Sequence, residues 1–161
     1  MTRKHFTIWH SLEGLGILLI VEYVLLQITS AAWMPIIFIA AAGGAIGTTY
    51  VSTQVIEEVK SAWHMLILLS LTTTEFVIFF AFEYWFLIQQ DPGSFLSLSP
   101  QPVTLLLHSV MTFVFNPIYL PADLAGQGLL LINTLGALGL VLFLLQNIGQ
   151  FRKNSGDAKN V

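Results

Sequence analysis

Four carboxylates lie inside apolar stretches of this chain, where an ionised group is costly. Glu13 and Glu22 fall in the first such stretch, and Glu75 and Glu83 in a later one. A charge at mid-bilayer costs on the order of 3 kcal/mol, so each of the four is a candidate functional group. At 100° per residue, Glu75 and Glu83 lie about 80° apart and share a broad helix face. Two interpretations are open: an ion or proton site between helices, and protonated carboxyls hydrogen-bonded across a helix interface.

Two histidines suggest a different chemistry. His10 and His64 each lie early in an apolar stretch, at similar predicted depth, which would suit a bis-imidazole haem or a quinone site. Hydrogen bonding at the membrane interface is the alternative role. Cysteine is absent, which excludes disulfides and Cys-based metal sites. No nucleophile–base pair, metal triad or phosphate-binding loop occurs at a recognisable spacing, so we expect no enzyme.

The composition is that of an integral membrane protein. Hydrophobic residues make up 55% of the chain and charged residues 9%, and the mean hydropathy is +0.78. Six Lys and Arg are too few for nucleic-acid binding. A spanning helix needs about 20 mainly apolar residues, and the stretches that qualify are 7–29, 32–52, 62–89 and 124–150. The predicted fold is therefore an all-α membrane protein with four transmembrane helices, in contact with lipid.

The basic residues predict the orientation of these helices. Lys and Arg occur at positions 3, 4, 60, 152, 153 and 159, and none occurs in segments 30–34 and 90–123. By the positive-inside rule, both termini and the 53–60 loop are cytoplasmic. Tyr84 and Tyr119 fall near predicted helix ends and are expected in the aromatic belt at the membrane interface.

Residues 100–112 are apolar but too short to span a bilayer. A half-helix that enters and leaves on one side is allowed where protein or water covers its end. We expect a re-entrant pore half-helix here, between the third and fourth transmembrane helices. It is followed by Pro121 and Gly126 and then by the last apolar run.

The order of outer helix, half-helix, loop and inner helix over residues 61–150 resembles the pore domain of the tetrameric pore-loop cation channels. Potassium channels of this family line the pore with the backbone carbonyls of Thr-Val-Gly-Tyr-Gly. In a gapless comparison the matching positions are Thr112, Val114, Pro121, Gly126 and an inner-helix hinge glycine at Gly136 or Gly139. The resemblance implies a homotetramer around a central axis, because one chain carries one such unit.

The selectivity signature departs from the family pattern. Phe115, Asn116 and Pro117 stand in place of Gly-Tyr-Gly, and proline fixes φ and removes an amide donor. We therefore expect no potassium selectivity of the usual kind, and a narrowing lined by side chains from Thr112, Phe113, Val114, Phe115, Asn116 and Pro117. A ring of Asn116 could coordinate an ion, whereas a ring of Phe115 would form a hydrophobic gate. The resemblance places His108 behind this loop, where it either braces the loop or simply packs.

The chain divides into three parts. Residues 1–60 form an N-terminal two-helix addition without the repeated basic residues of a voltage sensor; residues 61–150 form the pore-domain-like unit; residues 151–161 form a polar cytoplasmic tail, expected to be disordered. The first functional hypothesis is an ion channel with weak or non-standard selectivity and no cofactor. The second is a non-conducting accessory or scaffold subunit of a larger respiratory or photosynthetic membrane complex. The third is a haem- or quinone-binding redox subunit.

Overall fold

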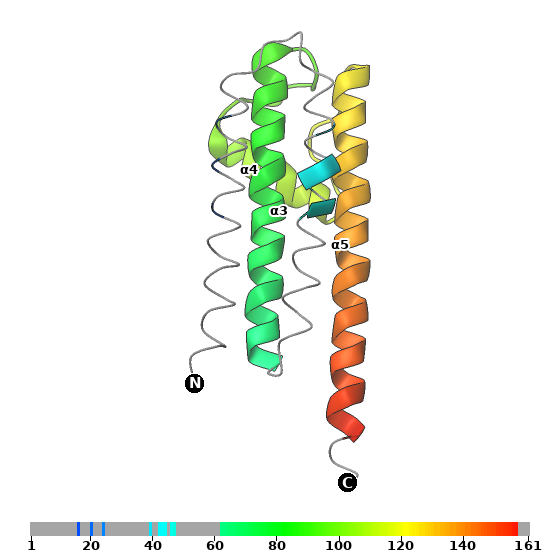
Figure 1. The fold of residues 1–161 in the computed structure, drawn as a ribbon. Helices are drawn as coiled ribbons and strands as arrows, with labels where there is room; N and C mark the ends of the chain where they lie inside the picture. The colour runs from blue at the N-terminus through cyan, green and yellow to red at the C-terminus, as the bar shows by residue number, and fades with distance from the viewer. Residues whose placement is uncertain are drawn as a thin grey trace.

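The computed structural model describes residues 62–157, together with positions 16, 20, 24, 39, 42–44, 46 and 47. The continuous part consists of three helices and no β-strand: α3 (Ala62–Gln90), α4 (Pro102–Phe113) and α5 (Leu124–Asp157). Figure 1 shows α3 and α5 side by side and antiparallel, with the short α4 beside one half of α3.

Two of these helices, over Met65–Gln90 and Leu124–Gln146, are long and apolar enough to cross a membrane. The predicted helical class is confirmed for this part of the chain. The other two predicted spans, 7–29 and 32–52, lie largely outside the described residues, although each described position within them is helical. The expectation that the tail is disordered is wrong for residues 152–157, because α5 continues to Asp157. Extending an existing helix avoids the cost of nucleating a new one.

Local sequence signals account for the helix ends. After Gln90, the Asp91 carboxylate accepts a hydrogen bond from the Gly93 amide at 3.1 Å, which forms the turn that ends α3. Pro102 opens α4, where its missing amide hydrogen costs nothing. Asp123 caps α5, since its Oδ1 accepts the Gly126 amide at 2.7 Å.

The segment between α3 and α5 leaves and returns at one end of the helix pair. The Leu96 amide donates to the Leu120 carbonyl at 2.9 Å, and the Ala122 amide donates to the Ser94 carbonyl at 2.8 Å. An isolated antiparallel bridge joins residues 95 and 121 between these bonds. The chain leaving α3 and the chain entering α5 are therefore tied together at the same end.

Between these tied ends, α4 reaches the middle of α3. The Ser109 hydroxyl donates to the Val77 carbonyl at 2.8 Å, and the Phe113 ring lies 5.7 Å from the Phe76 ring. Phe76 is 14 residues before Gln90, about 21 Å along the helix axis. With 12 residues, α4 is about 18 Å long, too short for a hydrocarbon core of about 30 Å.

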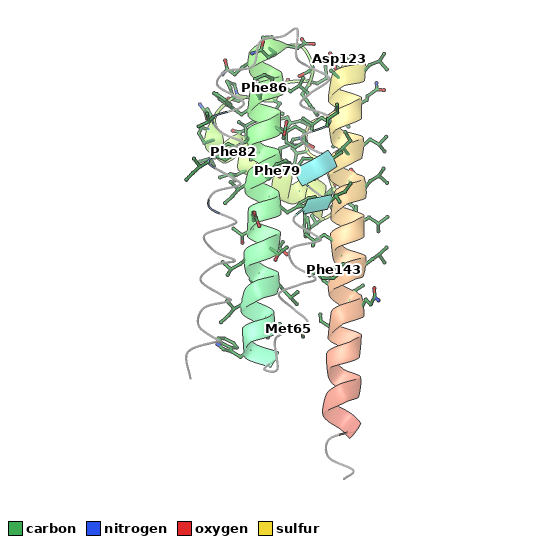
Figure 2. All side chains as sticks on the ribbon, viewed as in Figure 1. Met65, Phe79, Phe82, Phe86, Asp123 and Phe143 are labelled. Carbon is green, nitrogen blue, oxygen red and sulfur yellow. The ribbon has the colours of Figure 1, made fainter. Side chains whose placement is uncertain are left out.

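The core lies where α3, α4 and α5 meet. Its largest fully buried side chains of apolar or aromatic type are Phe76, Phe80, Tyr84, Leu87, Leu129 and Leu140. Gly44 lies against α3, because a Cβ on it would overlap the Phe79 ring. Side chains of α5 on the side away from α3 project outward without covering from the described residues (Figure 2). α5 is consequently less covered than α3.

Candidate functional site

The predicted narrowing begins where α4 ends. Phe115 donates its amide to the Thr112 carbonyl at 2.9 Å, and Asn116 donates its amide to the Met111 carbonyl at 2.8 Å. Phe115 has φ 62°. This pair of bonds around a left-handed residue is a Schellman motif, the usual way to close a helix, although glycine normally occupies the left-handed position.

The helix-closing turn has a chemical consequence. A potassium-type filter requires successive backbone carbonyls to point toward the pore axis. In the gapless comparison the filter strand corresponds to residues 113–117. Here this segment closes α4 instead, because Phe113 is the last helical residue and the amides of Phe115 and Asn116 donate back to the helix. Phe115, which stands at a filter glycine in the family pattern, adopts the left-handed conformation at a cost of about 1–2 kcal/mol. The main chain therefore closes α4 after Phe113, and the side chains of residues 114–116 are exposed.

The structure divides the six predicted lining residues into two groups. Thr112 is fully buried and Phe113 is half-buried against Phe76, so both side chains point into their own chain. The second group consists of Val114, Phe115 and Asn116, which are exposed, and Pro117, which is half-buried. We call residues 114–118 the tip, since Ile118 is also exposed.

Behind the tip lies a buried polar network that sequence reasoning missed. The Asn133 Nδ2 donates to the Tyr84 hydroxyl at 3.0 Å, and the Tyr84 side chain is also hydrogen-bonded to the Thr112 side chain. The Thr112 hydroxyl donates to the His108 carbonyl at 2.9 Å. Tyr84, Thr112 and Asn133 are each 0% exposed. The network joins α3, α4 and α5 at one point.

One residue of this network, Tyr84, does not lie where the sequence predicted it. Tyr84 was expected in the interfacial belt, and that prediction is wrong because neighbouring helices cover it completely. The position of Tyr84 near the predicted end of a helix does not indicate which face of that helix it occupies. Asn133 carried an available signal, since it is the single amide within the apolar run 128–145. Polar side chains in such runs commonly bond across helices.

His108 lies next to this network, in a box of aromatic rings. Its ring is T-shaped against Tyr84 at 4.6 Å, Phe95 at 5.4 Å and Tyr119 at 5.5 Å. Neither ring nitrogen has a hydrogen-bond partner among the described residues. Burial lowers the pKa of the imidazole to about 4, so the ring is neutral at physiological pH. These contacts join α4 to α3, to the segment before α4 and to the segment after it. A residue that braces the tip must make contacts of this kind.

The structure buries both described carboxylates of α3. Glu75 is 6% exposed and Glu83 is 0% exposed. The Oε2 atom of Glu75 has no hydrogen-bond partner within the described part of the chain. Glu13 and Glu22 lie outside the described residues, so the predicted carboxylate sites on the first helix stay predictions.

The remaining candidates are placed as follows. His10 lies outside the described residues, and for His64 the structure describes only the backbone, within α3; the haem or quinone pairing stays a prediction. Among the residues described, no group of three or more His, Cys, Asp and Glu could hold a metal ion. In α5, Gly136 is half-buried. Gly139 is exposed, and apart from its chain neighbours and the nearby backbone of α5 nothing lies within 4 Å of a Cβ added to it.

Chemically, the site offers few polar groups. Asn116 supplies the tip's one side-chain amide, which can both donate and accept hydrogen bonds. Beside it the exposed Phe115 ring is apolar. No protein-family model, curated protein or solved structure matches this chain.

Proposed function

We propose that this chain is the pore-forming subunit of a small ion channel, with weak or non-standard selectivity set by side chains at the tip. The observation that carries the proposal is the path of residues 91–123. They enter and leave at one end of α3 and α5, while α4 ends near Phe76, about 21 Å from that end.

This path supports a pore because of what a membrane tolerates. With α3 and α5 across the bilayer, the tip lies at membrane depth, and irregular backbone there must be covered by protein or face water. Within the described part of the chain, the amides of Ile118 and Tyr119 form no backbone hydrogen bond, and the tip is exposed. The tip therefore needs other copies of the chain or a water-filled path beside it.

Four copies around an axis meet that need. In the proposed assembly, the segment 91–123 is re-entrant from the outer side, and both termini are cytoplasmic. The uncovered apolar face of α5 packs against its neighbours and lipid. Asn116 then forms a polar ring at the narrowing and Phe115 an apolar one. The helix-closing turn at Phe115 argues against a potassium-type filter, because that filter requires an extended strand at this point.

The proposal is tested by ion flux with a charge placed at the tip. The chain is reconstituted into liposomes and planar bilayers, and reversal potentials are measured under mixed ion gradients. Asn116→Asp adds a ring of negative charge at the narrowing, so it should increase conductance and shift selectivity toward cations. Gln101→Glu is the matched control, because it adds the same charge at the exposed opposite end of α4. Absence of flux in every variant, or equal shifts in both, contradicts the proposal.

The second candidate function is a non-conducting accessory subunit of a larger membrane complex. It is favoured by the helix-closing turn after Phe113 and by the inward side chains of Thr112 and Phe113, which leave the tip without a filter. Native mass spectrometry of the protein, gently extracted from its own membrane, separates the candidates. A particle of four identical chains supports the channel, and a larger particle with other subunits supports the accessory role.

A further inference from the structure

Asn133 forms a polar contact between α5 and the rest of the described structure. Its Nδ2 donates to the Tyr84 hydroxyl at 3.0 Å, and both side chains are fully buried. Its Oδ1 has no hydrogen-bond partner among the residues described. A buried amide with an unpaired oxygen costs free energy that a leucine of similar size would not. Packing alone therefore does not account for an amide at this position.

The bond from Asn133 continues to the tip through two further residues. Tyr84 is hydrogen-bonded to the Thr112 side chain, and its ring lies 4.6 Å from the His108 ring. The Thr112 carbonyl accepts the amide of Phe115 at 2.9 Å, the bond that sets the left-handed residue of the turn. A continuous path of contacts thus leads from α5, through α3, to the first turn of the tip.

We propose that Asn133 is a positioning residue for the tip: by fixing Tyr84, it fixes the Thr112 turn from which residues 114–118 project. The inference rests on the proposed function in treating the tip as the narrowing of a pore. Residues 114–118 then occupy one defined position only while the Asn133–Tyr84 bond is intact. A displacement of α5 that breaks this bond releases the tip.

The absence of cysteine allows a direct measurement of tip mobility. A nitroxide label at Ile118→Cys reports on the tip, and one at Leu142→Cys, also at an exposed position, reports on α5. Each label is combined with Asn133→Leu, with Tyr84→Phe and with both. Thr134→Val is the matched control, because the Thr134 hydroxyl bonds to its own helix, at the Leu130 carbonyl.

The expected result follows from the net contribution of one hydrogen bond. Asn133→Leu and Tyr84→Phe should each raise the mobile population of the label at position 118 by about two- to tenfold. Both changes break the same path, so the double variant should show no further increase. Thr134→Val should leave the spectrum unchanged, and the label at position 142 should not respond to any of the variants.

Three outcomes separate the possibilities. An unchanged spectrum at position 118 in both Asn133→Leu and Tyr84→Phe overturns the positioning role. An equal response at position 142 also overturns it, because it shows general loosening of the helices. A response at the tip in a protein that conducts no ions supports the positioning role and overturns the pore. Tyr84→Phe retains the ring against His108, so the test does not depend on whether Asn133→Leu folds.

Discussion

Replacement of Gly126 by alanine tests how the loop between α3 and α5 is closed. Gly126 is buried in the first turn of α5, and a Cβ on it would overlap the Ser94 carbonyl oxygen and lie 3.1 Å from the Pro121 Cβ. The Ser94 carbonyl cannot move freely, because it accepts the Ala122 amide at 2.8 Å. We therefore expect Gly126→Ala to separate the two ends of the loop.

The size of the stability change follows from two costs and one gain. Overpacking costs about 1–3 kcal/mol, and loss of the bond from Ala122 to Ser94 costs about 0.5–1.5 kcal/mol. The higher helix propensity of alanine offsets up to about 1 kcal/mol. The free energy of unfolding should therefore fall by about 0.5–4.5 kcal/mol, with overpacking as the larger cost.

Gly139→Ala is the control within the same helix. Apart from its chain neighbours and the nearby backbone of α5, nothing lies within 4 Å of a Cβ added to Gly139. Only helix propensity therefore changes, and the free energy of unfolding should rise by up to about 1 kcal/mol. Reversible unfolding in mixed micelles of increasing SDS content, followed by circular dichroism, gives both values. Hydrogen exchange at the Leu96 and Ala122 amides should accelerate in Gly126→Ala alone. Equal stability of the two variants would refute this account of the loop.

Three further predictions concern the loop and α4. Ser97 and Phe115 have φ 61° and 62°, so Ser97→Gly and Phe115→Gly should each raise the free energy of unfolding by up to about 1 kcal/mol, whereas Ser99→Gly should not. A lower free energy of unfolding in both variants contradicts backbone strain at these positions. Asp123→Ala should lower the free energy of unfolding by about 0.5–2 kcal/mol through loss of the α5 cap, whereas Asp123→Asn should retain most of this stabilisation. Denaturation in mixed micelles measures both variants. Burial holds the folded His108 pKa near 4, below its unfolded value, so stability should decrease as pH falls from about 6.5 to about 4. His108→Phe should remove that part of the pH dependence of unfolding, and an unaltered pH profile would contradict it.

The helices were predictable because each depends on a long local pattern. The predicted segments 62–89, 100–112 and 124–150 compare with Ala62–Gln90, Pro102–Phe113 and Leu124–Asp157 in the structure. Apolar runs of this length, interrupted by Asp-Pro-Gly and by proline, specify where helices begin and end. The polar residues after position 150 carry no such pattern, so the end of α5 was not predictable.

The conformation of the tip was less accessible from sequence. A filter strand over residues 112–117 would be one extended unit, whereas in the structure α4 includes Thr112 and Phe113 and closes over the next three residues. A Schellman motif with phenylalanine at its left-handed position has no signal of its own, because glycine is the usual marker.

The sequence by itself determined that the described part of this chain is helical and that two of its helices are apolar enough to cross a membrane, because composition and apolar run length are local properties. The tertiary structure alone decided that Asn133 meets Tyr84, 49 residues away, and that Thr112 turns inward while Asn116 remains exposed. A hydrogen bond between distant residues depends on the rotation and axial position of each helix relative to its neighbours. Packing of the whole core sets these quantities, and no single segment encodes them.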